Sequence, residues 1–366
     1  MNPRKPVPFN DLTRIHKPLT QNFEDSVKSV AETSGFVLGQ AVKEFEETYA
    51  ALENAQFIVG VDNGTNAIEL MLRAAGIKHG DEVITSAFTF VATVFGIERA
   101  GATPVLVDIE SNSPLMDPQE IEKAVTPRTK AILLVSLHGR VSNIEKYVEI
   151  AKSNNLMILL DGAQSHLGEY AGKKLVKYFT AISTSFYPGK NLGALGEGGA
   201  VITDNADIAA NVRLYRDWGA AAKYQHDEWG ANFRLHALQA RFLSAKLPHI
   251  TEWTNERRSI GKVFNAALPN HLLRTPVENA GDHVFHIYEI KVQDRNKASE
   301  HLTNQGIQWG IHYPKTVYQN KAYSHLRTGE YPNAETFSAQ TLSIPLFPRM
   351  TEDEQNRVIE ACKVIP

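Results

Sequence analysis

Residues 184–199 read TSFYPGKNLGALGEGG and place one lysine, Lys190, between an apolar strand pattern and a glycine-rich loop. A lysine between a strand and such a loop can bind a phosphate or act as a nucleophilic amine, although most lysines are solvated surface charges. The Gly-Lys pair suggests a phosphate loop, but that motif requires glycine where Thr184 stands and Ser or Thr where Asn191 stands. The glycines also fail to spell GxGxxG. Both nucleotide-binding motifs are therefore disfavoured.

The composition predicts a soluble chain that can bury a large core and divide into two domains, with 366 residues of which 43% are hydrophobic. The net charge of -3 argues against nucleic-acid or membrane binding through bulk charge. One cysteine, Cys362, leaves no disulfide framework and no cysteine cluster for a metal, so no metal site is expected. The start lacks a signal-peptide pattern and the apolar runs are too short for a membrane span, which predicts a cytoplasmic protein.

From about residue 57 to 205, short β-rich runs alternate with helical patterns. Several of the runs are continuously apolar, as expected when helices cover both faces of a sheet. The pattern predicts an α/β fold with a mostly parallel central sheet flanked by helices. Strands are predicted at 57–61, 82–85, 104–109, 130–137, 156–161, 181–186 and 199–203, and helices at 65–75, 91–100, 118–124 and 143–153.

The remaining chain predicts a smaller C-terminal α+β domain at 246–366, next to a large domain at 1–245. A long helical stretch at 234–265, interrupted at Pro248, leads out of the large domain. Near the N-terminus, the segment of about 1–30 is expected to pack on the small domain or on a partner subunit. Further strands are predicted at 283–292 and 308–312, and further helices at 22–30, 41–52, 298–304 and 352–362.

Polar residues at strand ends are candidates for a site, because ligands of such folds bind beyond the carboxyl ends of the strands. Gly64 and Thr65 follow a strand and open a helix, whose free N–H groups and positive end suit a phosphate. An ordinary capped turn is the alternative. Asp161 ends an apolar strand and needs a hydrogen-bonding or cationic partner, unless it only caps a helix. Gln164 follows three residues later and can face the same cavity.

Together with Lys190, these residues supply what pyridoxal phosphate needs. The lysine amine forms a Schiff base, and the acid keeps the pyridine nitrogen protonated so that the ring can accept electrons. A flat ring also stacks on an aromatic side chain, for which Phe90 and Phe88 are available. The sequence therefore favours a pyridoxal phosphate enzyme.

Over nearly its whole length the chain also resembles a known family. This is the DegT/DnrJ/EryC1/StrS group of pyridoxal-phosphate-dependent nucleotide-sugar aminotransferases, which have fold type I. The shared motifs are VDNGTNA from Val61, GDEVITSAFTFVAT from Gly80, GATPVLVDIE from Gly101, DGAQSH from Asp161, SFYPGKNLGALGEGGAVIT from Ser185, WGANFRLHALQA from Trp229, HYP from His312 and LSIPLFPRMTEDE from Leu342.

The resemblance implies a role for each matching residue. Lys190 would form the Schiff base and move the proton, Asp161 would pair with the pyridine nitrogen, and Gln164 would hydrogen-bond the ring hydroxyl. Phe90 would stack on the ring. The phosphate would be held by Gly64, Thr65 and Ser185, joined by Asn232 from the neighbouring subunit, and the substrate candidates are Tyr187, His226, His312 and Tyr313.

The role of Asn232 implies a homodimer with shared active sites. Three positions depart from the family pattern. Leu160 stands where an acid often precedes the aspartate, His236 stands where an Asp usually follows RL, and residues 137–140 read LHGR where an aromatic and Gln are common. These positions adjoin the reactive set, so the departures bear on substrate contacts and leave the cofactor chemistry intact.

The implied reaction moves an amino group from L-glutamate to the keto group of a nucleotide-linked sugar. The run FYPGKNLGALGEGG looks most like enzymes that aminate C3 of a dTDP-3-keto-6-deoxyhexose, for O-antigen, lipopolysaccharide or glycosylated metabolite biosynthesis. Other acceptors stay open: C4 of a dTDP- or UDP-4-keto sugar, an inosose and an 8-keto octulosonate. A regulator that binds the cofactor without turnover is the non-enzyme alternative. Relatives that became dehydratases have histidine where this chain keeps Lys190.

Overall fold

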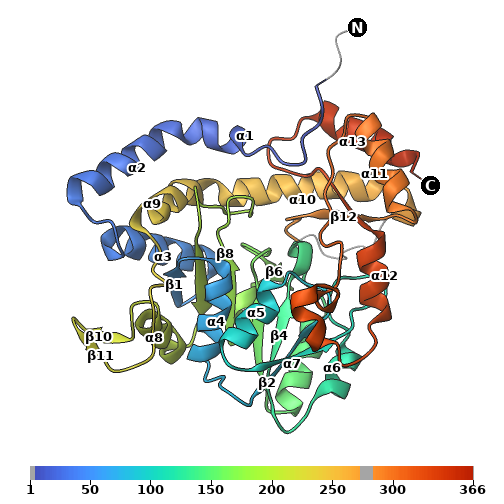
Figure 1. Ribbon diagram of the computed structural model, residues 1–366. Coiled ribbons are helices and arrows are strands. Elements are labelled where there is room, and N and C mark those ends of the chain that lie inside the picture. The colour runs from blue at the N-terminus through green and yellow to red at the C-terminus, as the bar shows by residue number, and fades with distance from the viewer. Residues whose placement is uncertain (1–4, 273–282, 366) are drawn as a thin grey trace.

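One central sheet of seven strands organises the computed structural model, which describes residues 5–272 and 283–365 (Figure 1). The strand order is β1-β9-β8-β5-β4-β2-β3. β9 runs antiparallel to both neighbours, and the other adjacent strands are parallel. The mostly parallel sheet predicted from the sequence is confirmed. The bounds are β1 Phe57–Val61, β2 Glu82–Ser86, β3 Thr103–Val107, β4 Thr129–Val135, β5 Met157–Asp161, β8 Ala181–Ser185 and β9 Gly199–Thr203.

Helices cover both faces of this sheet because successive strand residues point to opposite sides. In β5, Ile158 and Leu160 belong to one apolar core, and Leu159 between them belongs to another. The first core is closed by α3 Gly39–Glu53, α7 Ile144–Ser153 and α9 Ala237–Lys246, and the second by α4 Gly64–Ala74, α5 Ala92–Arg99 and α8 Ala206–Tyr215. Because both faces of the sheet are covered in this way, its strands are continuously apolar.

The C-terminal part builds a further core around a two-stranded sheet. α10 Ile250–Ala267 continues from α9 through a short 3-10 turn that contains Pro248, so the predicted interruption is present. β12 Tyr288–Lys291 pairs antiparallel with β13 Thr341–Ile344. The apolar faces of α10, α11 Arg295–Asn304 and α13 Glu352–Lys363 pack on this sheet, and α12 Pro332–Gln340 precedes β13.

Two predicted strands of this part are wrong in extent or type. Residues 283–292 contain a strand only at Tyr288–Lys291. Residues 308–312 form no strand, since Gly310 makes a single bridge to Ser343 at the free edge of β13. The chain leaves that edge at once, because His312 and Tyr313 turn into a cavity. The strand β13 and the helix α12 were not predicted.

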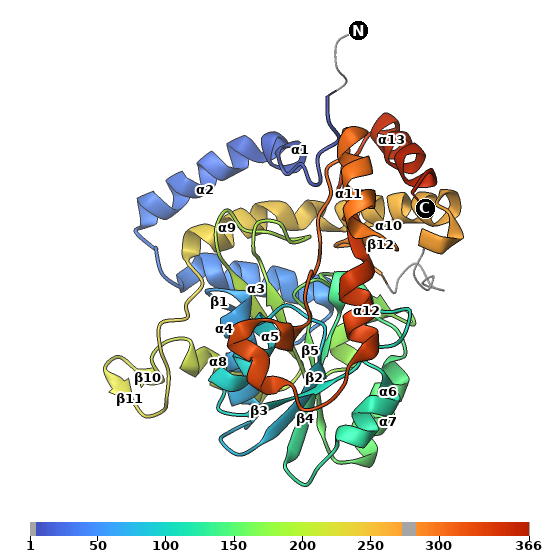
Figure 2. The ribbon, with the colours of Figure 1, turned by 45° about the vertical axis from the view of Figure 1, so that its right-hand side comes forward.

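The N-terminal segment spans both parts of the molecule. Val7 bridges to Ile307, and Arg14 forms an ion pair with Glu354 at 2.6 Å. The helix α2 then crosses above α9, as both ribbon views show (Figure 2). The remaining elements are α1 Thr13–His16, α2 Thr20–Thr33, α6 Pro118–Ala124, β6 Glu169–Tyr170, β7 Lys173–Lys174, β10 Ala220–Ala222 and β11 Gln225–His226.

Ring packing holds the C-terminal part against the end of the sheet. Phe88, which follows β2, packs on Phe337 of α12 with ring centroids 5.1 Å apart. Leu137 after β4 and Val317 belong to the same apolar cluster. This cluster places residues 312 and 313 over the carboxyl ends of the strands. Within the two described ranges, no helix has the length and apolarity to cross a membrane.

Candidate active site

A cavity of about 800 Å³ lies at the carboxyl ends of β1, β4, β5 and β8. The structure brings together there almost every site residue predicted from the sequence. Only Asn232 and His226 do not line the cavity of their own chain. The predicted residues that line it are Gly64, Thr65, Phe90, Asp161, Gln164, Ser185, Tyr187, Lys190, His312 and Tyr313.

Lys190 stands on the loop after β8, and its side chain is exposed only in part. Its backbone N–H donates to the carbonyl of Tyr187 at 2.9 Å. Loss of water in the cavity lowers the pKa of Lys190 to about 8, and the charge of Asp161 opposes this shift. A neutral amine is the nucleophilic form, so the site makes that form far more abundant near neutral pH.

The glycine-rich loop folds back on itself directly after Lys190. A Cβ at Gly193 would lie 2.3 Å from the carbonyl oxygen of Pro188, so only glycine fits there. The carbonyl of Gly193 in turn accepts a hydrogen bond from Lys246 Nζ at 2.5 Å. The glycines therefore shape the loop that carries Lys190.

An anion site is formed where α4 begins. Asn63 caps this helix, and its side chain accepts from the N–H of Asn66 at 2.9 Å. The first N–H groups of a helix have no partner within it, and its N-terminus carries partial positive charge. Ser185 packs directly on this turn, since a Cβ at Gly64 would lie 2.5 Å from the Ser185 Cβ. Helix end and hydroxyl together suit a phosphate.

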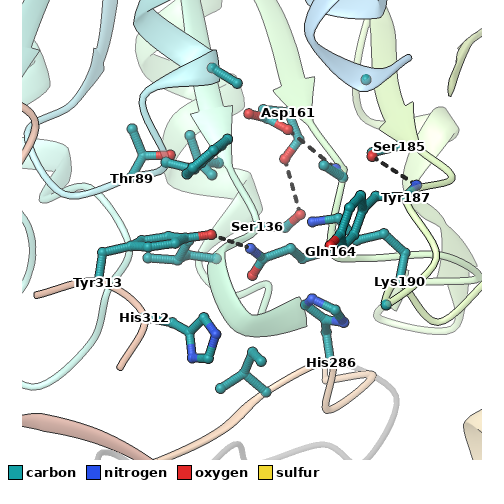
Figure 3. A pocket seen from close by; sticks show the side chains of 18 of the residues that line it. Thr89, Ser136, Asp161, Gln164, Ser185, Tyr187, Lys190, His286, His312 and Tyr313 are labelled. Carbon is teal, nitrogen blue, oxygen red and sulfur yellow. Dashed lines mark hydrogen bonds between the residues drawn. The ribbon is translucent and has the colours of Figure 1, made fainter. Parts of the chain in front are cut away.

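Asp161 ends β5 and is buried at the back of the cavity (Figure 3). Its Oδ2 accepts from Thr93 Oγ1 at 2.7 Å, and its Oδ1 accepts from the Ala163 N–H at 3.2 Å. Burial raises the pKa of this carboxyl, and these hydrogen bonds and the charge of Lys190 act in the opposite direction. Among residues 5–272 and 283–365, no cation is in hydrogen-bond contact with this buried acid, which therefore suits a cationic ring nitrogen of a ligand.

Gln164 and Tyr313 close the other side of the cavity. Gln164 Oε1 accepts from the backbone N–H of His138 at 2.5 Å, and Gln164 Nε2 donates to the Tyr313 hydroxyl at 3.3 Å. Figure 3 shows this second contact across the cavity. The ring of Phe90 lies 5.5 Å from that of Tyr313, and 52% of Phe90 is exposed. Phe90 thus keeps an aromatic face free for a flat ligand.

Sequence reasoning did not identify Thr93 and His286 as polar residues of this site. Thr93 lies one helical turn after Thr89, and their hydroxyls are 2.9 Å apart, so the spacing of four could have indicated a shared face. His286 lies in a stretch predicted as strand; its Nδ1 is 3.1 Å from Asn191 Oδ1. Burial, then the charge of Lys190, lowers the pKa of His286 well below its usual value.

His226 and Asn232 lie on the surface, away from the cavity of their own chain. His226 ends the hairpin β10–β11, and its Nδ1 is 2.9 Å from the Trp218 carbonyl. Asn232 bridges to Asp217, and its Oδ1 accepts from Arg234 Nε at 3.0 Å. The predicted role of Asn232 in a neighbouring subunit stays a prediction.

The strand order with one antiparallel strand, and a lysine and an acid at strand ends, define the fold-type-I class of pyridoxal-phosphate-dependent transferases. Within this class the chain belongs to the DegT/DnrJ/EryC1/StrS aminotransferase family, whose model matches residues 18–363. The family, the fold class and the aminotransferase class expected from the sequence are confirmed.

Individual relatives align with the chain from end to end. It is 39% identical to a Geobacillus stearothermophilus protein named pleiotropic regulatory protein, over 97% of each chain. It is 35% identical to the dTDP-3-amino-3,4,6-trideoxy-alpha-D-glucose transaminase of Streptomyces venezuelae, over 98% of this chain and 95% of the relative. The crystal structure of S. venezuelae DesV in complex with a ketimine intermediate superposes with a TM-score of 0.94, at 34% identity and 98% coverage of both chains.

Proposed function

We propose that this protein is a pyridoxal-phosphate-dependent aminotransferase that moves the amino group of L-glutamate to C3 of a dTDP-3-keto-6-deoxyhexose. The observation that carries the cofactor assignment is one cavity in which Lys190, Asp161 and the anion site at the α4 N-terminus converge. The similarity to a dTDP-amino-sugar transaminase along the whole chain supports the acceptor. The product would be an amino sugar for glycan or glycosylated metabolite biosynthesis.

Pyridoxal phosphate is the cofactor of this enzyme, and the residues present fit it. Ser185 and the first turn of α4 would hold the phosphate, and Asp161 would provide the negative charge that a protonated ring nitrogen requires. The half-exposed face of Phe90 accepts the ring. When bound, the cofactor supplies an electron-accepting ring for the electrons released as a C–H bond breaks.

Lys190 then acts as the base and the acid of the reaction. Its Nζ, with a pKa of about 8 in the protein, takes the proton from the α-carbon of the amino donor. In the second half of the reaction it returns a proton to C3 of the sugar. The cavity walls, including Gln164 and Tyr313, limit the access of water during these transfers. Tyr187, His312 and Tyr313 line the remaining space and are the proposed substrate contacts.

The acceptor is tested with a panel of keto sugars and L-glutamate. We expect amination of a dTDP-3-keto-6-deoxyhexose at C3, with NMR of the product placing the nitrogen. Turnover only with dTDP- or UDP-4-keto sugars, an inosose or an octulosonate would replace this acceptor by another within the same family. A protein that never binds pyridoxal phosphate would contradict the cofactor assignment itself.

A homodimer with shared sites is part of this proposal. Among the described lining residues, Lys190 is the only lysine or arginine, yet a nucleoside diphosphate brings two negative charges. Large apolar side chains lie exposed beside the segment that contains Asn232. Two backbone hydrogen bonds place them there: Ala237 N–H donates to the Phe36 carbonyl, and Trp218 N–H donates to the Ala231 carbonyl. The exposed side chains are Phe36, Val37, Trp218, Tyr224 and Trp229. A second copy covers them and adds Asn232 and His226 to the site.

Subunit mixing tests the shared site directly. Lys190→Ala and Asn232→Ala each remove one component, so each variant alone has low activity. In a mixed dimer, the intact Lys190 of one chain meets the intact Asn232 of the other. Equal mixing is therefore expected to restore about a quarter of the wild-type activity, since half of the dimers are mixed and each has one intact site. No recovery after proven subunit exchange would contradict the role of Asn232.

A regulator that binds the cofactor without turnover is a second candidate, because one relative is named a pleiotropic regulatory protein. The lysine, the acid and the anion site of this chain favour turnover. The two functions are separated by the absorbance of the bound cofactor after one equivalent of glutamate. An enzyme converts the pyridoxal form to the pyridoxamine form within a single turnover, whereas the spectrum of a non-catalytic regulator stays unchanged.

A further inference from the structure

His138 lies in the turn of residues 137–140, which departs from the family pattern, and the structure buries it completely. Its backbone adopts φ 62°, in the left-handed region that non-glycine residues rarely occupy. Such a conformation costs free energy and persists only where surrounding contacts hold it. The contacts of His138 therefore stabilise this backbone conformation.

The imidazole of His138 has an acceptor at each nitrogen. Nε2 lies 2.8 Å from the carbonyl oxygen of His312, and Nδ1 lies 3.3 Å from Glu289 Oε2. The second geometry is not aligned for a hydrogen bond but is close enough for an ion pair. Both nitrogens of the His138 ring therefore face an acceptor.

Glu289, on β12, is buried and supplies the matching negative charge. Burial alone would raise its pKa, but the charges of His138, Arg140 and His283 hold the pKa below the usual range. Arg140 Nη2 lies 3.6 Å from the other carboxylate oxygen. A carboxylate in this surrounding remains ionised, and it lies against the His138 ring and the Arg140 guanidinium.

Two contacts connect His138 to the cavity. Its backbone N–H donates to Gln164 Oε1, and its ring nitrogen binds the carbonyl of His312, the residue before Tyr313. Gln164 Nε2 donates to the Tyr313 hydroxyl at 3.3 Å, so the two contacts of His138 are linked to each other across the cavity (Figure 3). The bond from the amide of His138 to Oε1 fixes the orientation of the Gln164 amide, with Nε2 directed to the Tyr313 hydroxyl.

We propose that the buried His138–Glu289 contact positions Gln164 and Tyr313 in the cavity, so that this pair of polar side chains sets the ligand-facing geometry of the site. His138 and Glu289 are positioning residues, since neither lines the cavity. The pair joins the turn after β4, the strand β12 and the segment of residues 312 and 313 into one unit. This inference rests on the proposed function for its kinetic consequence only.

The test uses Glu289→Gln and His138→Asn in the holoenzyme. Asparagine tolerates the left-handed backbone better than most residues, so His138→Asn removes the ring and leaves the turn feasible. The matched control is Glu82→Gln, which neutralises a buried carboxylate paired with Arg128 at the opposite end of the strands. For both test variants we expect kcat/KM for the keto sugar to fall about tenfold at full cofactor occupancy. The control is expected to change it less than twofold.

Two further readouts separate positioning from general destabilisation. Hydrogen exchange of the backbone at residues 310–316 needs no turnover, and we expect faster exchange there in Glu289→Gln and not in Glu82→Gln. If the sugar substrate is wrong, this measurement still decides the inference. In a Tyr313→Phe background, Glu289→Gln should change kcat/KM very little, because both substitutions act through the same set of contacts. Unchanged exchange at 310–316, or effects of the two substitutions that multiply fully, would overturn the proposal.

Discussion

Burial lowers the pKa of two lysines of this protein, but the two side chains have different surroundings. Desolvation lowers the pKa of both Lys190 and Lys246 to about 8. Lys246 is 1% exposed, donates to the Gly193 carbonyl at 2.5 Å and lies 2.9 Å from His16 Nε2. Lys190 faces an open cavity with an acid and an anion site. A lowered pKa therefore makes a lysine nucleophilic in principle, and only access and neighbouring groups make it catalytic.

Lys190→Ala is the substitution with the largest expected effect. It removes both the amine that binds the cofactor covalently and the base that moves the proton, so kcat should fall about 10⁴-fold or more. Lys246→Met is the matched control, and it should change kcat by less than about threefold. Steady-state transamination measures both variants. If Lys246→Met proved as inactive as Lys190→Ala, the contrast between the two lysines would fail.

Asp161→Asn tests the acid that distinguishes the surroundings of Lys190. Without its negative charge the ring nitrogen of the cofactor loses its proton, so we expect kcat to fall about 10²- to 10³-fold. The amide oxygen can still accept from the Ala163 N–H, and the amide nitrogen can donate to the Thr93 hydroxyl, which limits structural damage. Single-turnover conversion by glutamate gives the rate. A loss below threefold would remove Asp161 from its assigned role.

The stability of the apo protein should depend on pH through both lysines alike. The folded pKa of Lys246, about 8, lies below the value of 10.5 of a free lysine. Between these values the unfolded chain binds the proton, so the lysine's contribution to stability rises with pH. The difference in unfolding free energy between the wild type and Lys246→Met should therefore increase by about 1 to 3 kcal/mol when the pH is raised from 7.5 to 10.

Urea unfolding of both proteins at each pH measures this difference, and other titrating groups cancel in the subtraction. The difference in unfolding free energy between the wild type and Lys190→Ala should also increase as the pH is raised. A difference that falls as the pH rises would mean that burial does not depress these pKa values.

Ser185→Ala tests the anion site with the smallest expected effect. The hydroxyl contributes one hydrogen bond beside the N-terminus of α4, whose N–H groups remain. We expect the affinity for pyridoxal phosphate to weaken about tenfold while bound enzyme keeps most of its kcat. Titration of the apo protein with the cofactor gives the constant. Ser26→Ala, which removes a hydroxyl of α2 bonded to the Asn22 carbonyl, is the control.

The site residues at the strand ends could be predicted from the sequence, because their positions depend only on neighbouring residues in the chain. Gly64, Asp161 and Lys190 each end an apolar run, and parallel strands bring such ends to one edge of the sheet. The contacts of His138 could not be predicted this way. They depend on how residues 138, 289 and 312 pack across the molecule, and no spacing in the chain encodes that packing.

The same limit explains the strand misplaced at residues 308–312. Whether such a segment pairs depends on a partner strand, which its own residues do not determine. Here Tyr288–Lys291 occupies one side of β13, and Gly310 reaches the other side with a single residue. Thr93 was missed for a simpler reason, since its link to Asp161 joins a helix to a strand 68 residues away.

Reduction of the holoenzyme with borohydride tests the central claim most directly. Borohydride fixes the cofactor permanently to the lysine that forms the Schiff base, and peptide mass spectrometry then identifies that lysine. The account predicts one modified peptide, carrying the cofactor on Lys190, with Lys246 unmodified. Modification of Lys246 instead, or cofactor lost entirely after reduction, would contradict it.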